Sequence, residues 1–259
     1  MTKADSLQSE AIGVTLFSVV MVALFVGLGI WQLQRRVEKH ALIAELTTRL
    51  AASPVPLPAP AQWPALTPAH DEFRRVTFTA TYRHLPDAMA YSPGSGVRPD
   101  VSGAGTWAFL PAQLASGQTV VIDAGFVPNM MQDRPVENRA VAPLITGRPV
   151  TLTGYLRFPE KPGMFTLAND VAKRLWYTRD HLSMARALGW GQGGEVAPFY
   201  VDLETPVPAN GVPKPGPLQV DLPDNHMQYA ITWFGLASIV VIGFAVWMRR
   251  RRAGLARQT

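Results

Sequence analysis

Two uncharged apolar stretches, residues 11–33 and 229–248, bracket the middle of this chain of 259 residues. A helix needs about 20 apolar residues to cross the hydrocarbon core of a bilayer, and both stretches are long enough. The segment between them, residues 34–228, is polar enough to fold in water. The sequence therefore predicts an integral membrane protein, with two transmembrane helices flanking one folded domain and with tails at residues 1–10 and 249–259.

Basic residues beside the apolar stretches predict the orientation. The second stretch runs into four arginines at residues 249–252, with Arg257 beyond, and such clusters stay on the cytoplasmic side. Two crossings then place both termini in the cytoplasm and the domain on the outer face, in the bacterial periplasm or the mitochondrial intermembrane space. Arg35, Arg36 and Lys39 oppose this orientation, but a long loop is translocated largely regardless of its charge.

The first stretch is predicted to remain as a membrane anchor. Its apolar run is longer than a typical signal-peptide core, and no small-residue cleavage site follows it. Apolar residues continue at helical spacing to Leu50, so the helix is expected to extend beyond the bilayer. It must end before the proline run at residues 53–60, which we interpret as an extended spacer.

The middle domain is predicted to be rich in β-structure. Short runs of β-branched and aromatic residues, bounded by Gly, Pro and Asn, occur at residues 73–82, 105–110, 119–127, 149–158, 175–177 and 199–203. One helix is expected at residues 181–188, with Asp180 as its N-cap. Several strands with one or two helices indicate an α+β domain in the form of a small barrel or sandwich.

Charge and cysteine content exclude several classes of function. The formal net charge is +5, and the five arginines after residue 248 supply all of it, so the charge is a sign of topology and not of a nucleic-acid partner. The chain has no cysteine. This excludes disulfides, thiolate zinc sites, iron–sulfur clusters and copper sites made by paired cysteines. Histidine, present five times, is the remaining soft metal ligand.

Four stretches carry a resemblance to a known family. They are GIWQLQR at residues 29–35, VVIDAGFVP at 120–128, the series PEKPG, ND and WYTRD within 159–180, and NHMQYAITWFG at 225–235. In order and spacing they resemble the surfeit-one family of cytochrome c oxidase assembly factors, over most of the chain. Two positions depart from the family pattern, because Ala124 stands where an arginine is usual and Asp224 where an asparagine is frequent.

The resemblance implies a protein of the bacterial inner membrane with two spans and a periplasmic β-rich domain. It implies a role in the placement of haem a in subunit I of cytochrome c oxidase. For bacterial members it also implies that haem a is bound, with the histidine before the second span, here His226, as the iron ligand. The expected partners are oxidase subunit I and the lipid bilayer, with haem a synthase as a further candidate.

His226 lies three residues before the second apolar stretch, at the expected outer boundary of the membrane. On a helix it shares a face with Tyr229, Ala230 and Trp233. A half-buried imidazole among aromatic side chains suits axial ligation of a large planar cofactor, so His226 is predicted to bind the iron beside Tyr229 and Trp233. The alternative is an interfacial histidine in an aromatic belt, with no ligand.

Three residues of the first helix are predicted to complete this site. Trp31 and Arg35 are four residues apart and face His226 if the two helices pack side by side; Arg35 or Arg36 then pairs with haem propionates. The alternative is an anchoring tryptophan with snorkelling arginines. Gln32 is an amide at the end of an apolar helix, and we expect it to hydrogen-bond to the second span.

Other residues with chemical potential are predicted to be structural. His40, His70, His84 and His181 have no metal-ligand spacing and are expected at the surface or in caps. Residues 189–194 match the letters of the dinucleotide fingerprint, but a helix precedes them and a strand follows, so we interpret them as a loop. The chain lacks a nucleophile elbow, a His-Glu-x-x-His pair and a phosphate loop, and an enzyme is not expected.

Two functions therefore remain open. The first is a non-enzymatic assembly factor that holds haem a between its two helices and presents it to oxidase subunit I. The second is a cofactor-free membrane chaperone or interaction module for subunit I. In the second case the same aromatic residues are contacts to protein.

Overall fold

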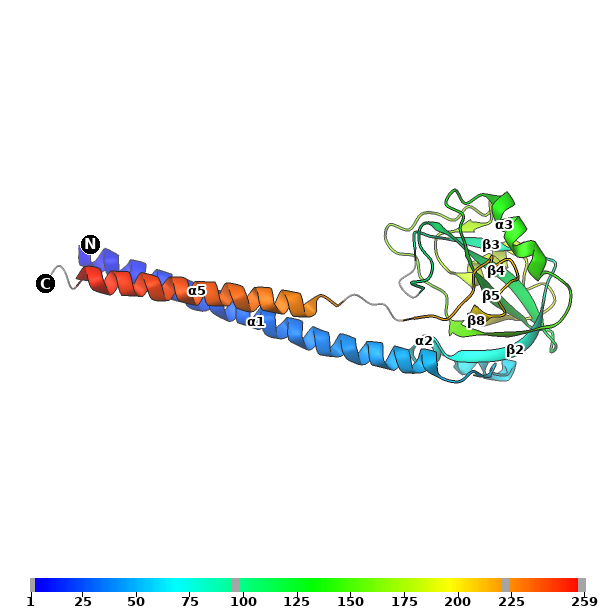
Figure 1. The fold of residues 1–259 in the computed structure, drawn as a ribbon, viewed down its shortest axis with the longest axis horizontal. Coiled ribbons are helices and arrows are strands. Elements are labelled where there is room, and N and C mark those ends of the chain that lie inside the picture. The colour runs from blue at the N-terminus through cyan, green and yellow to red at the C-terminus, as the bar shows by residue number, and fades with distance from the viewer. Residues whose placement is uncertain (1–2, 95–97, 220–223, 256–259) are drawn as a thin grey trace. The chain divides into compact units, whose positions relative to one another are not determined.

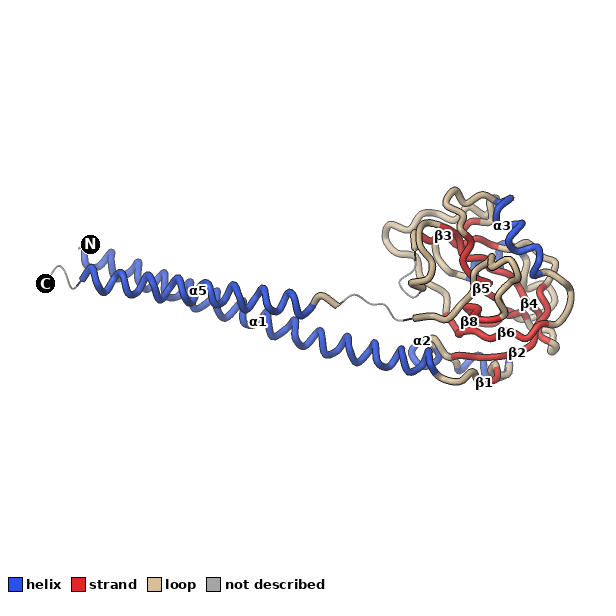
Figure 2. Tube along the Cα trace, in the orientation of Figure 1, coloured by secondary structure: helices blue, strands red, loops and turns tan. Residues whose placement is uncertain are grey.

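The computed structural model describes residues 3–94, 98–219 and 224–255, shown as a ribbon in Figure 1 and by secondary structure in Figure 2. The chain divides into two compact units. One, residues 1–44 and 222–259, is helical over most of its described residues and is called here the helical unit. The other, residues 45–221, contains all the strands and is called the sheet unit.

The helical unit consists of two long helices, except that residues 45–51 of the first belong to the sheet unit. Helix α1 runs from Lys3 to Ala51 and α5 from His226 to Leu255, and both are long and apolar enough to cross a membrane by length and composition. The predicted continuation of the first helix beyond residue 33 is confirmed. Residues 3–10, expected as a tail, are also helical, and Arg257 lies outside the described residues.

The two helices of this unit pack side by side and antiparallel (Figure 1). Gln32 of α1 contacts His226 at the start of α5, whereas the earlier Phe25 stacks on the later Trp233, with ring centroids 5.8 Å apart. Gly29 permits this approach, because a Cβ atom at that position would lie 2.6 Å from the ring of Phe234. A small residue at a helix contact is a common means of close packing between apolar helices.

The sheet unit is built on one eight-stranded sheet with the strand order β1-β2-β6-β8-β5-β4-β3-β7. The strands are β1 Val55–Pro56, β2 Arg75–Tyr82, β3 Ala88–Ser92, β4 Gly105–Leu114, β5 Thr119–Val127, β6 Val150–Arg157, β7 Leu175–Trp176 and β8 Val196–Thr205. The helices are η1 Pro60–Ala65, α2 Pro68–Asp71, α3 Arg134–Val141, η2 Ala142–Leu144 and α4 His181–Leu188.

An additional antiparallel pairing of β2 with β4 joins Ala80 to Leu114 and closes a circuit of five strands, β2-β6-β8-β5-β4. Along the chain, the strands of this sheet lie between two long apolar helices, which agrees with the predicted layout. A closed circuit of pairings favours the barrel over the sandwich. The choice between these two forms stays a prediction.

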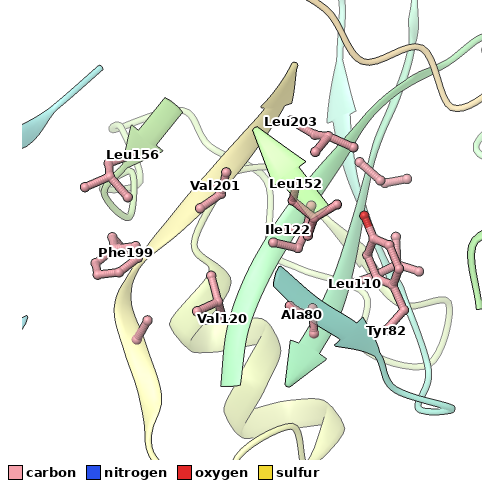
Figure 3. Close-up of a cluster of buried hydrophobic side chains, with 14 of the residues drawn as sticks. Ala80, Tyr82, Leu110, Val120, Ile122, Leu152, Leu156, Phe199, Val201 and Leu203 are labelled. Atoms are coloured by element: carbon pink, nitrogen blue, oxygen red, sulfur yellow. The ribbon is translucent and has the colours of Figure 1, made fainter. Parts of the chain in front are cut away.

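The core lies on both faces of the central strand β5, which is buried at all nine positions. Val120 and Ile122 point into one apolar cluster with Leu152 and Val201, drawn in Figure 3. Val121 belongs to a second cluster on the opposite face, covered by α4. Successive side chains of a strand point to opposite faces, so a strand between two clusters needs a continuous apolar run.

Most predicted elements of this unit are confirmed. Residues 119–127 form β5, and 181–188 form α4, whose N-cap Asp180 accepts a hydrogen bond from the Ser183 amide at 3.1 Å. Residues 189–194 form a loop that begins with Gly189 in the left-handed region. Strand β3 and helix α3 were not predicted.

The proline run, predicted as an extended spacer, is extended at Val55 and Pro56 and is paired there with the sheet. Val55 and Pro56 form the edge strand β1, parallel to β2, and the Leu57 amide donates to the Thr77 carbonyl at 3.2 Å. Prolines alternate through this run, so the amides of the residues between them remain free to pair. A proline-rich strand is tolerated at a sheet edge because only one side needs donors.

Candidate functional site

His226 is the first residue of α5, and Asp224 fixes that end of the helix. The backbone amide of His226 donates to Asp224 Oδ1 at 3.0 Å. This hydrogen bond satisfies one of the amides that the first turn of a helix leaves without a partner. The pKa of Asp224 lies below its usual range, first because of this hydrogen bond and then because of His40.

The imidazole of His226 is held by α1. Its Nδ1 lies 2.8 Å from Gln32 Oε1, and the Gln32 side chain is only 9% exposed. The predicted hydrogen bond from Gln32 to the second apolar helix is thereby confirmed. Gln32 lies one turn from Gly29, where the helices are too close to admit a Cβ atom beside Phe234, so the amide can reach across to α5.

Asp224 joins the start of α5 to α1 by two further contacts. Its Oδ2 lies 2.7 Å from His40 Nε2 and 3.3 Å from Arg36 Nε. These contacts were not predicted; His40 was expected at the surface or in a cap, and it is exposed. A signal was present, since Gly29, Gln32, Arg36 and His40 follow one another at helical spacing and share a face.

His226 also lines a surface recess of about 350 Å³ with four residues of α1: Arg35, Glu38, Lys39 and Leu42. Within it, Arg35 Nη1 and Glu38 Oε2 form an exposed ion pair at 2.7 Å. The recess thus combines one imidazole, two basic side chains and one acid. Such a recess suits a molecule that carries a metal ion, which the imidazole can bind, together with negatively charged groups.

The predicted aromatic residues lie apart from this recess. The Trp31 side chain is 51% exposed, while the neighbouring Gln32 carries the contact to His226. Tyr229 is exposed, and Trp233, one turn further along α5, packs on Phe25. The structure thus brings Gln32 and Arg35 to His226 and leaves Trp31 outside, because the packed face of α1 runs through residues 29, 32 and 36. Their roles in cofactor binding stay predictions.

The sheet unit contains a second group of charged residues, which sequence reasoning missed. Asp123 and Asp202 are register neighbours on β5 and β8, and both are fully buried. Arg179 Nη1 lies 3.9 Å from Asp123 Oδ2 and 3.6 Å from Asp202 Oδ2; Arg157 Nη1 lies 3.6 Å from Asp202 Oδ2. Burial and the neighbouring Asp202 raise the pKa of Asp123 well above its usual range.

Two other buried titratable groups belong to the same unit. Glu137 of α3 accepts a hydrogen bond from Thr106 Oγ1 at 2.7 Å, and burial raises its pKa to about 7. His181 was expected at the surface or in a cap, but it is fully buried, with Nε2 3.0 Å from the Ala197 carbonyl oxygen. Burial lowers its pKa to about 4. His181 therefore acts as a neutral core residue.

Comparison with known proteins gives one consistent family. The family model described as "SURF1 family" matches residues 19–238. The rat protein "Surfeit locus protein 1" is 31% identical over 247 residues, covering 90% of this chain and 76% of the rat protein. The "SURF1-like protein" of Monosiga brevicollis is 32% identical over 237 residues, covering 88% of this chain and 84% of its own length.

The human "Surfeit locus protein 1" is 30% identical over 224 residues, covering 82% of this chain and 70% of the human protein. The family match includes His226, Gln32 and Asp224, and so contains the whole recess at the start of α5. It also contains all the strands of the sheet unit.

Proposed function

The chain belongs to the SURF1 family, and we propose that it is a membrane-anchored assembly factor for haem–copper oxidase. Family membership supports the role in oxidase assembly. The finer proposal is that the protein assists the placement of haem a in subunit I by binding the haem at the start of α5. Oxidase subunit I is the proposed partner, and haem a synthase is a candidate donor.

The observation that carries the haem proposal is the setting of His226. Its Nδ1 is engaged by Gln32, and the ring borders a recess with Arg35 and Lys39. In the described part of the chain, no three His, Asp or Glu side chains gather as ligands of a bare ion. A single imidazole suits an iron whose four equatorial positions are filled by a porphyrin, and guanidinium groups suit its propionates.

These residues fit a haem, and each has a separate task. His226 would coordinate the iron, Gln32 would hold its ring, and Arg35 would bind a propionate. The haem itself supplies redox chemistry only later, in the oxidase. Asp224 keeps the first turn of α5 in place through the His226 amide. The protein would thus bind and orient haem without catalysing a reaction, and we propose that it is not an enzyme.

We propose the same membrane arrangement that the sequence predicts. The two helices span the inner membrane of a bacterium, both termini are cytoplasmic, and the sheet unit is periplasmic. The antiparallel packing of α1 and α5 supports it, because two helices that cross a bilayer in succession must run in opposite directions. The basic residues that end α5, at positions 249–252, support the cytoplasmic location of the C-terminus.

A cofactor-free interaction module is the second candidate, and a loop of the sheet unit favours it. Met164 and Phe165 are both 92% exposed, and Leu167 beside them is also exposed. Adjacent exposed apolar side chains often mark a contact surface for another protein. This loop suits a contact with subunit I whether or not haem is bound.

Co-expression with the enzymes of haem a synthesis tests the two candidates. We expect the purified wild-type chain to carry haem a in its absorption spectrum, and the His226→Ala variant to lose most of it. The His70→Ala variant is the control, because His70 belongs to the sheet unit. A colourless wild-type chain that still co-purifies with subunit I would favour the interaction module.

A further inference from the structure

The orientation of the Gln32 amide sets the direction of its hydrogen bond with His226. The atom of Gln32 that faces His226 Nδ1, at 2.8 Å, is the carbonyl oxygen Oε1. A carbonyl oxygen only accepts hydrogen bonds, so with this orientation of the Gln32 amide the proton is on Nδ1. In a neutral imidazole with a proton on Nδ1, the lone pair available to a metal is on Nε2.

We infer that Gln32 selects the Nδ1–H tautomer of His226 and thereby presents Nε2 as the metal-binding atom. This inference rests on the proposed function for the identity of the metal, an iron held in a porphyrin. Free histidine in water favours the opposite tautomer, with the proton on Nε2. The contact with Gln32 must reverse that preference for Nε2 to bind without first losing its proton.

The surroundings of Gln32 hold its amide in place. Gln32 is almost fully buried where the two helices meet, and a buried amide without a partner is costly. The close contact of Gly29 with Phe234, one turn away, sets the distance between the helices. The Asp224 carboxylate fixes the His226 backbone by accepting a hydrogen bond from the His226 amide. Ring and backbone of His226 are therefore held by separate residues.

This arrangement also defines the class of ligand. With Nδ1 turned toward Gln32, the opposite edge of the ring is the one left to a ligand, and the residues around the recess include Arg35 and Lys39. The site is suited to a planar metal complex that carries acidic groups, with the metal on Nε2. Gln32 is a positioning residue, since it acts through His226.

The tautomer can be measured in the full chain without haem. The protein is labelled with ¹⁵N-histidine, placed in lipid nanodiscs, and examined by NMR at a pH where the imidazoles are neutral. The His226 signals are assigned by their loss in His226→Ala. We expect the Nδ1–H tautomer in the wild type and a change to mainly Nε2–H in Gln32→Leu.

Two variants serve as controls. Gln32→Glu keeps an acceptor oxygen and should keep the Nδ1–H tautomer. Gln34→Leu changes an exposed amide on the same helix and should leave the His226 signals unchanged. A wild type in the Nε2–H form, or a Gln32→Leu variant that keeps the wild-type tautomer, would overturn the inference.

Titration of haem into the same samples gives a second measurement. Loss of a residue that orients a metal ligand typically weakens metal binding by about 10–100-fold, and we expect Gln32→Leu to do so. The two proposals fail in different ways. Nδ1–H without haem binding contradicts the proposed function, whereas haem binding with His226 in the Nε2–H form contradicts only the role of Gln32.

Discussion

The helical unit and the sheet unit place their ionisable side chains in opposite settings. In the helical unit, His226, Arg36 and His40 lie at a helix contact with partly exposed side chains. In the sheet unit, Asp123 and Asp202 are sealed inside the core. A ligand from outside can reach the first group and not the second, which is why we place the binding function on the helices.

The two settings also differ in energy. A buried charge that loses its partner costs several kcal/mol, whereas an exposed ion pair contributes about 1 kcal/mol or less. The charged residues of the sheet unit should therefore govern folding, and those of the helical unit should govern binding with little effect on folding. Substitutions in each unit can test this division.

The largest effect is expected from Arg157→Met. The Arg157 guanidinium pairs with Glu72 at 2.6 Å and approaches the buried Asp202. Its removal takes away one of the two guanidinium groups beside Asp202 and breaks the pair with Glu72, which should lower the free energy of unfolding by about 3–5 kcal/mol. Tryptophan fluorescence during denaturant unfolding measures this. The control is Arg148→Met at an exposed position, whose free energy of unfolding should lie within about 0.5 kcal/mol of wild type. Equal losses of stability in the two variants would contradict the division between the two units.

The next effect is a pH dependence carried by Glu137. Its folded pKa of about 7 lies above the ordinary value of 4.5, so the protonated form is favoured by folding. The stabilisation is fully present below pH 4.5 and is lost as the pH rises through 7. The glutamine in Glu137→Gln cannot ionise, so this loss in the free energy of unfolding, on the order of 3 kcal/mol at pH 8, should not occur in the variant.

Unfolding curves at pH 5 and pH 8 measure the contribution of Glu137. Wild type should lose more stability between these values than Glu137→Gln. The exposed Glu195→Gln serves as the matched control and should follow wild type. Parallel pH profiles for wild type and Glu137→Gln would show that the carboxyl is ionised in the fold at no cost.

Gly29→Val should separate the helices without unfolding the sheet unit. The added side chain meets the Phe234 ring, and overpacking of this kind costs about 1–3 kcal/mol. Cross-linking of cysteines introduced at Ser18 and Val241, which line a common recess, reports the helix contact in this cysteine-free chain. Gly27→Val is the control, since no atom lies within 4 Å of its Cβ position. Equal cross-linking in both variants would contradict the packing.

The smallest effect is expected from Asp224→Ala. It removes the acceptor of the His226 amide, and loss of such a cap costs about 1 kcal/mol. Faster amide hydrogen exchange in the first turn of α5 measures the effect. Glu38→Ala, which removes the exposed pair with Arg35, should change exchange there by less. If Glu38→Ala has the larger effect, Asp224 is not the residue that fixes this end.

Much of the sheet unit could be predicted because its strands are locally recognisable. The run at 119–127 is apolar apart from Thr119 and Asp123, and α4 carries an N-cap at Asp180 and a left-handed glycine at its end. Strand β3, Ala88–Ser92, has no β-branched residue, so its local sequence does not indicate a strand. Its place depends on the antiparallel pairing with β4, a tertiary contact.

The candidate site was predictable only in part. The position of Gln32 in an apolar helix indicated a polar contact, and His226 supplied it. The contact of Arg36 with Asp224 joins residues 188 positions apart, and it depends on which face of α1 packs on α5. Asp123 lies within an apolar run, and only the register of β5 on β8 reveals its buried neighbour Asp202.

Haem titration of the nanodisc-embedded chain tests the central claim most directly. The account predicts one saturable site in the wild type, with affinity reduced about tenfold or more in His226→Ala, and near wild-type binding in Arg157→Lys, which alters only the sheet unit. Equal affinity of wild type and His226→Ala would contradict the assignment of the binding function to the helical unit.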